Sequence, residues 1–157
     1  MIKRYRALQT QRGQEAVERV ANKLRQWNLY KHIEIADGNN AVPDIICKKE
    51  PSYIDGEYLI GIEVKTIQSY VKDIKENCEH VGRVCLPRQQ WNGLQEWSKS
   101  HNSATLEMIV EIRVLRSKIG FLYFKIKEGY IDQFFGNKQN EMMGISMWEV
   151  INVGEKI

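Results

Sequence analysis

The chain has 157 residues, of which 43% are hydrophobic and 27% are charged, which is the composition of one ordinary globular domain. No apolar run approaches the roughly 20 residues of a membrane span, and the leading residues MIKRYRALQTQR lack the apolar core of a signal peptide. We therefore expect a single domain over residues 1–157, located in the cytoplasm and without a membrane partner.

The net charge of +3 is unevenly distributed along the chain. Residues 1–31 hold eight basic and two acidic side chains, a local charge of +6, and the remainder sums to −3. A basic leading segment suits a polyanionic partner, although a solvated helix face accounts for the same residues equally well.

A helix is expected over residues 11–28. Its apolar residues recur at the helical spacing i, i+3, i+4 and i+7, namely Val17, Val20, Ala21 and Leu24. Glu15 and Glu18 lie along the flank of this stripe. Solvation is the simplest role for them, although a carboxylate at the edge of a buried face can also look into a cleft.

The pattern then predicts strands at residues 32–36, 44–47, 58–67, 83–86, 106–115 and 121–126. Pro87 is expected to open a helix to about residue 100, on which Trp91, Leu94 and Trp97 form a stripe that fits a core better than a base-stacking platform. Residues 69–81 suit either a short helix or a loop. Residues 128–157 form a C-terminal extension with an added edge strand at 146–153. A central mixed sheet with helices on its faces, an α/β fold, is the natural packing of these elements.

The three cysteines do not suit a disulfide framework, because their number is odd and no CxxC pair occurs. Cys78, His80 and Cys85 are close in sequence but fall short of the four ligands of a structural zinc site. Cys47 lies in an apolar strand and is most simply a small buried residue.

Three charged residues interrupt the apolar strands near the middle of the chain. Asp44 opens the run DIIC, whereas Glu63 and Lys65 lie two residues apart within LIGIEVKT. Residues two apart on a strand share a face, so Glu63 and Lys65 are expected to project together while Ile62 and Val64 point into a core. Such a Glu-x-Lys can also be a simple charge pair, but unpaired charges are expensive in strands this apolar.

Two carboxylates and one lysine at one spot are the minimum for binding a divalent metal and cutting a phosphodiester. Mg²⁺ held by a few carboxylates keeps positions open for water and phosphate. We expect Asp44 and Glu63 to share a Mg²⁺ ion, for which Mn²⁺ can substitute. Lys65 is expected to keep its charge beside them and to contact the phosphate or the attacking water.

These segments resemble the PD-(D/E)xK nuclease superfamily and, within it, archaeal-type Holliday-junction resolvases. VPDII at 42–46 is similar to the first half of the family motif, and IEVK at 62–65 is similar to the second. Gly13 with AVER at 16–19 is similar to the family's glycine and glutamate-bearing helix. VCLPRQQ at 84–90 is similar to its strand-to-helix segment with a glutamine, and ATLEMIVEIRV and IGFLYFKI look like its last two strands. The resemblance implies a restriction-endonuclease-like central mixed β-sheet flanked by helices.

The resemblance also implies the site residues. The active site would consist of Glu18, Asp44, Glu63, Lys65 and Gln90, with Glu18, Asp44 and Glu63 as metal ligands; Glu15, one turn from Glu18, is an alternative helix carboxylate. Residues 1–12 would form a basic arm, and DNA phosphates would be contacted by Lys3, Arg4, Arg6, Arg12 and Arg88.

The implied function is a Mg²⁺-dependent, structure-selective DNA endonuclease that resolves four-way junctions as a homodimer, wherever DNA lies in the cytoplasm or nucleoid. Two alternatives remain open: a restriction- or repair-type endonuclease acting on linear duplex or flap DNA, and a catalytically silent DNA-binding module of the same fold. A Ser-His-Asp or Cys-His enzyme is disfavoured, because His32, His80 and His101 sit in no recognisable nucleophile setting.

Overall fold

A computed structural model describes residues 2–28, 30–36, 42–49, 58–76, 82–136 and 141–157, and within these ranges it describes the backbone alone for residues 2–10 and 58. The helices are α1 (Ile2–Gln26), α2 (Val71–Glu76), α3 (Arg88–Ser100), α4 (Glu128–Gly136) and α5 (Met147–Val153). The strands are β1 (Tyr30–Ile35), β2 (Ile45–Lys49), β3 (Tyr58–Tyr70), β4 (Arg83–Pro87), β5 (Thr105–Leu115), β6 (Phe121–Lys127), β7 (Met142–Ser146) and β8 (Glu155–Lys156).

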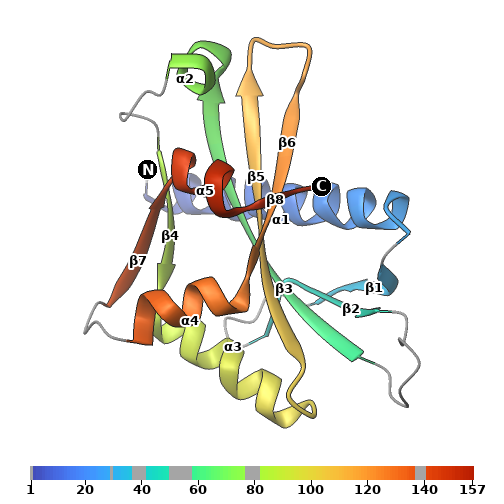
Figure 1. Cartoon of the computed structure of the whole chain (residues 1–157). Helices are drawn as coiled ribbons and strands as arrows, with labels where there is room; N and C mark the ends of the chain where they lie inside the picture. The colour runs from blue at the N-terminus through green and yellow to red at the C-terminus, as the bar shows by residue number, and fades with distance from the viewer. Residues whose placement is uncertain (1, 29, 37–41, 50–57, 77–81, 137–140) are drawn as a thin grey trace.

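Six strands form one mixed sheet in the order β1-β2-β3-β5-β6-β8, and β4 and β7 form a separate antiparallel pair (Figure 1). Only β3 and β5 run parallel; the other neighbours in the main sheet are antiparallel. The predicted central mixed sheet flanked by helices is therefore confirmed. The strand predicted at 83–86 is present as β4, and its backbone pairs with β7 of the C-terminal extension.

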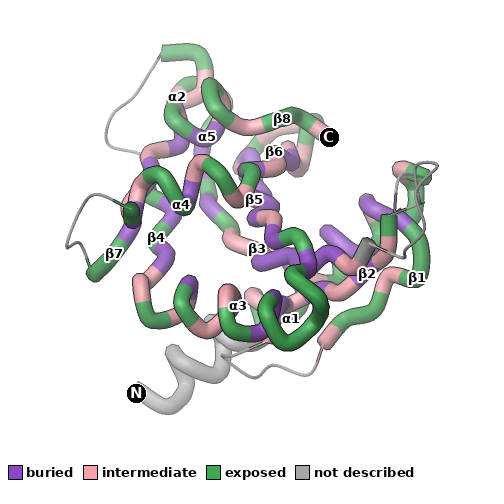
Figure 2. The backbone as a smooth tube through the Cα atoms, turned by 60° about the horizontal axis from the view of Figure 1, so that its bottom comes forward, coloured by how far each residue is buried: buried purple, intermediate pink, exposed green. Residues whose placement is uncertain are grey.

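Each face of the sheet carries its own core. Helix α1 covers one face, where Val20, Ala21 and Leu24 pack on β2, β3 and β5. The other face packs against α3, α4, α5 and the β4–β7 pair, and there the predicted stripe of Trp91, Leu94 and Trp97 is buried, as expected. Buried residues accordingly concentrate on β3 and β5 between these layers (Figure 2). Cys47 is also buried, as predicted.

Helix α1 is longer than the apolar stripe predicted. It begins at Ile2 rather than near Gln11, so residues 2–12 belong to the same helix. Hydrophobic periodicity marks only the part of a helix that packs on a core, which explains why the first turns gave no signal.

Two undecided or wrong assignments lie after β3. The segment 69–81 begins as the end of β3 and continues as the short helix α2; Cys78 and His80 lie outside the described residues. The edge strand expected at 146–153 is instead helix α5. The Ser146 hydroxyl accepts a hydrogen bond from the backbone N–H of Glu149 and so caps this helix.

Helix α3 begins at Arg88, one residue later than predicted, because Pro87 is the last residue of β4 and the N-cap of the helix. No helix in the described ranges is long and apolar enough to cross a membrane.

Candidate active site

A close approach of two strands brings Asp44 beside β3. Pro43 packs directly over Gly61, where a Cβ atom would lie 2.6 Å from Pro43 Cγ and 2.7 Å from Trp97 Cζ3. Only glycine leaves room for this contact. The next residue after Pro43 is Asp44, and the adjoining register pairs Ile45 with Ile62, so Asp44 stands next to Glu63.

Asp44 and Glu63 form a buried carboxyl pair. The side chain of Asp44 accepts a hydrogen bond of 2.8 Å from the backbone N–H of Val64 and lies within hydrogen-bonding reach of Glu63. Burial and the charge of Asp44 raise the pKa of Glu63 to about 8. Burial also raises the pKa of Asp44, against the lowering effect of its bonds to Val64 and Glu63. Without a cation the pair therefore retains a proton near neutral pH.

Gln90, on the first turns of α3, connects this pair to Lys65. Its Nε2 donates to Glu63 Oε1 at 2.5 Å, and its Oε1 accepts from Lys65 Nζ at 3.1 Å. Lys65 Nζ also lies 3.6 Å from Glu63 Oε1. Glu63 and Lys65 thus share a face of β3 as predicted, while Ile62 is fully buried in the core on the opposite face.

Glu18 lines the cavity at this pair. The cavity has a volume of about 420 Å³, and its walls come from α1 and the strand residues Ile35, Asp44, Glu63 and Val64. Glu15, the alternative helix carboxylate, is not on its wall and instead accepts a hydrogen bond from Gln11. The geometry thus favours Glu18 over Glu15.

The described residues hold no cluster of three Asp, Glu, His or Cys side chains that could surround a metal ion. Asp44 and Glu63 therefore form a two-carboxylate site, with Glu18 farther along the wall of the same cavity. Carboxylate oxygens are the ligands that Mg²⁺ prefers. The raised pKa values mean that the two carboxyl groups are costly to ionise together, and a bound cation would remove that cost. The residues present fit a divalent cation in this sense.

A buried ion pair that sequence reasoning missed holds α1 against the sheet. Arg19 donates two hydrogen bonds of 2.9 Å to the carboxylate of Glu111, which is fully buried on β5. Tyr123 on β6 donates a third, and the Arg19 guanidinium stacks over Phe121. Arg19 is the residue after Glu18, so this ion pair fixes the part of the helix that faces the cavity. The one available signal was Glu111 itself, an acid inside an apolar strand.

The residues expected to contact DNA lie in different settings. Arg12 is exposed on α1 near the cavity-lining residues Gly13 and Gln14. Arg88 donates to the backbone carbonyl of Phe135 at 3.2 Å and stacks on its ring, so it ties α3 to α4. The side chains of Lys3, Arg4 and Arg6 lie outside the described residues.

Comparison with protein-family models and with curated protein sequences gives no match. Among solved structures, the chain is similar to Hjc, a Holliday junction resolvase from the archaeal hyperthermophile Archaeoglobus fulgidus. The similarity covers 84% of this chain and 89% of the other, with a TM-score of 0.46 and 13% sequence identity.

Proposed function

We propose that this protein is a metal-dependent endonuclease that hydrolyses phosphodiester bonds in DNA. The observation that carries the proposal is the chain of contacts from Asp44 through Glu63 and Gln90 to Lys65, beside a cavity lined by Glu18. A buried acid pair connected to a lysine is costly for folding and adds little packing, which favours a chemical role.

Each residue has a role in this proposal. Asp44 and Glu63, with Glu18 from the cavity wall, hold a divalent cation, Mg²⁺ or Mn²⁺. When bound, that ion supplies an activated water and neutralises charge on the phosphate. Lys65 places a positive charge beside the scissile phosphate, and Gln90 keeps Lys65 and Glu63 in a fixed relative orientation.

The finer proposal is that the substrate is branched DNA, such as a four-way junction, and that the protein acts as a homodimer. Two copies of one site related by twofold symmetry can cut symmetry-related strands of a junction. Cleavage of linear duplex or flap DNA by the same site is the alternative, and it shares the same chemistry.

The test compares cleavage of a labelled four-way junction, a flap and a linear duplex, each with Mg²⁺ and with EDTA. Asp44→Asn and Glu63→Gln should each lower the cleavage rate by at least about a hundredfold, because each removes a charged metal ligand. Glu96→Gln is the matched control, since Glu96 is an exposed acid on α3 and lies outside the cavity.

Cleavage that persists in EDTA, or wild-type rates in both site variants, would refute the metal site. Equal cleavage rates on the junction and the linear duplex would contradict junction resolution and favour an endonuclease that acts on linear duplex DNA. DNA binding without cleavage of any of the three substrates would indicate the catalytically silent module.

A further inference from the structure

An exposed polar strip leads away from the cavity along one face of β3. Val64 lines the cavity, and the following residues on the same face, Thr66, Gln68 and Tyr70, are all exposed. Their neighbours Ile67 and Ser69, on the other face, are buried. The register with β5 is unbroken to Tyr70, which pairs with Leu115, so the alternation of faces persists to the end of the strand. Among the hydrophobic residues of β3 on this face, Val64 is the last that packs in the core under α1.

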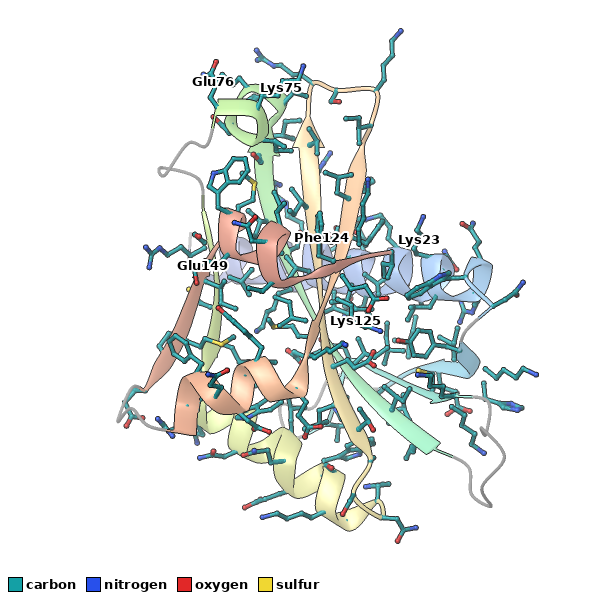
Figure 3. All side chains as sticks on the ribbon, viewed as in Figure 1. Lys23, Lys75, Glu76, Phe124, Lys125 and Glu149 are labelled. Atoms are coloured by element: carbon teal, nitrogen blue, oxygen red, sulfur yellow. The ribbon has the colours of Figure 1, made fainter. Side chains whose placement is uncertain are left out.

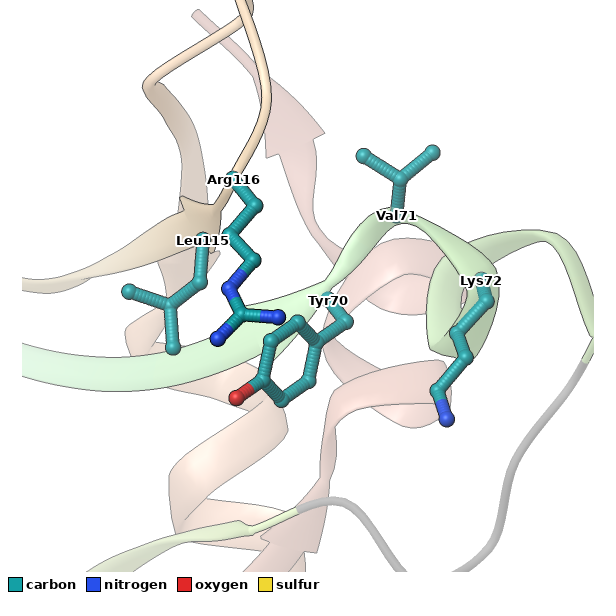
Figure 4. Close-up of a pocket in the computed structure, with 5 residues that line it drawn as sticks. All are labelled: Tyr70, Val71, Lys72, Leu115 and Arg116. Atoms are coloured by element: carbon teal, nitrogen blue, oxygen red, sulfur yellow. The ribbon is translucent and has the colours of Figure 1, made fainter.

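The strip ends in a notch at the far end of the sheet. The notch has a volume of about 530 Å³ and is lined by Tyr70 and Val71, Lys72 of α2, and Leu115 and Arg116 of β5 and its turn. Figure 4 shows the Arg116 guanidinium and the Tyr70 ring directed into the same space. Tyr70 is 42% exposed, which is high for so large an aromatic side chain.

Positive charge in and around the notch is largely uncompensated. Among the described residues, the side chains of Arg113, which is the register partner of Gln68, and of Arg116 take part in no hydrogen bond or ion pair, and both residues are exposed. Lys72 lies over the Tyr70 ring at 6.0 Å. Lys75 on α2 projects at the same end of the molecule (Figure 3).

Acidic groups at this end offset only part of that charge. Glu111, the acid on the same face of β5, is fully buried and bonded to Arg19. Asp73 accepts a hydrogen bond from the backbone N–H of Tyr70, and Glu76 lies at the end of α2. None of the residues that form the strip and line the notch is acidic, namely Thr66, Gln68, Tyr70, Val71, Lys72, Arg113, Leu115 and Arg116.

We propose that this notch binds a backbone phosphate of the same nucleic acid that enters the cavity, through the Arg116 guanidinium and the Tyr70 hydroxyl. Arg and Tyr are ordinary donors to phosphate oxygens, and a cationic, polar surface favours a polyanion over a second protein face. The inference rests on the proposed function for its substrate. The notch would be a second point of contact with the nucleic acid, and Arg113 lies between the notch and the cavity.

The position of the notch sets the length of nucleic acid that it can reach. Tyr70 lies seven residues along β3 from Glu63, a distance of roughly 23 Å at the usual rise per residue. That distance is on the order of seven base-pair steps of B-DNA. The contact would therefore lie well beyond the scissile phosphate, on the face of β3 opposite the side chains of Glu63 and Lys65 and continuous with Val64 on the cavity wall.

The experiment measures DNA affinity in EDTA by fluorescence anisotropy over a range of salt concentrations, with a duplex of roughly 20 base pairs and a four-way junction. Arg116→Gln should weaken binding about tenfold and lower the slope of log affinity against log salt by about 0.9, the value for one phosphate contact. Tyr70→Phe should weaken binding about fivefold and leave the slope unchanged, because it removes a hydrogen bond but no charge.

Lys99→Gln is the matched control, because Lys99 is an exposed cation at the end of α3, on the opposite end of the molecule from α2 (Figure 1). Its affinity and slope should equal those of the wild type. Wild-type affinity and slope in both Arg116→Gln and Tyr70→Phe would overturn the proposal that the notch binds a phosphate. Equal losses of affinity in Arg116→Gln and Lys99→Gln would overturn it as well. If the wild type neither binds nor cuts DNA, the proposed function fails and this inference fails with it. If the wild type cuts DNA and the notch variants bind normally, only this inference fails.

Discussion

Gln90 is the residue on which the geometry of the candidate site most depends. Its amide contacts the acid and the base at once, donating to Glu63 and accepting from Lys65. An amide can satisfy both partners because it carries a donor and an acceptor in one plane. Lys65 Nζ also lies 3.6 Å from Glu63 Oε1, so the amide of Gln90 holds an existing ion pair in one orientation.

We predict that Gln90→Ala lowers the rate of DNA cleavage by about tenfold to a hundredfold, the usual cost of losing a residue that orients a metal ligand. Gln89→Ala is the control, because Gln89 is the preceding residue on α3 and is exposed. Single-turnover cleavage at saturating Mg²⁺ is the measurement. Equal rates in the two variants would remove Gln90 from the site.

The carboxyl pair predicts how stability depends on pH. The pKa of Glu63 is raised to about 8 by burial and by Asp44, whereas the pKa of a glutamate in an unfolded chain is about 4.3. The protonated form is therefore favoured in the folded state, so its stabilising contribution is fully present below about pH 4 and is lost as the pH rises through about 8.

The melting temperature of the metal-free protein should thus fall between about pH 5 and pH 9, and less so in Glu63→Gln, which does not titrate. Mg²⁺ should raise the melting temperature more at about pH 8.5 than at about pH 6, where protons compete for the same oxygens. Scanning calorimetry with and without Mg²⁺ measures both effects. A Mg²⁺ effect that is larger at the lower pH would contradict the proposed site.

At the scale of elements, one buried ion pair decides where α1 lies relative to β5 and β6. Arg19 is partly exposed, with 33% of its side chain accessible, whereas Glu111 is fully buried. Removing the arginine leaves a carboxylate in the core without its counter-charge, while removing both charges does not.

Arg19→Leu should accordingly lower the free energy of unfolding by about 2–4 kcal/mol, toward the lower end because Arg19 is partly solvated. Arg19→Leu combined with Glu111→Leu should recover a large part of that loss. Urea denaturation of the two variants and the wild type measures the difference. Equal stability of the single and double variants would mean that the pair does not act as a unit.

Helix α5 shows how a local signal competes with side-chain composition. MWEVINV is rich in β-branched and aromatic residues, which favoured a strand. Ser146, which precedes this segment, instead forms a Ser-x-x-Glu capping pair with Glu149 inside it. Ser146 Oγ accepts a hydrogen bond from the Glu149 N–H and donates one to the Glu149 carboxylate. That spacing is visible in the sequence and predicts the helix start.

Ser146→Ala should cost about 1 kcal/mol of stability, the usual value for a lost N-cap. Ser117→Ala, in the turn between β5 and β6, is a comparison at a serine outside any helix. The midpoint of thermal unfolding for the two variants checks the prediction. A smaller loss for Ser146→Ala than for Ser117→Ala would mean that the cap does not hold α5.

At the scale of the whole molecule, the proposed homodimer predicts a solution mass about twice the 18.4 kDa of one chain. Sedimentation equilibrium at several concentrations measures it. A single 18.4 kDa species that still cleaves junctions would show that two sites in one particle are unnecessary.

The residues of the site were predictable because the chemistry depends on local patterns. Glu63 and Lys65 share a face because strand geometry has a period of two, and Asp44 opens a strand of the same apolar character. Gln90 was inferred only through a resemblance. The position of Glu18 on the flank of the apolar stripe allowed it to face a cleft, but the same pattern applied to Glu15.

The sequence by itself determined the charged residues in apolar strands, the order of most elements and the α/β class, because these follow from short-range periodicity and composition. Only the tertiary structure decided that Pro43 sits over Gly61, that Glu18 rather than Glu15 lines the cavity, that β4 pairs with β7, and that Arg19 meets Glu111. All four depend on contacts between residues far apart in the chain. Such contacts are set by how the layers pack, and no local pattern encodes them.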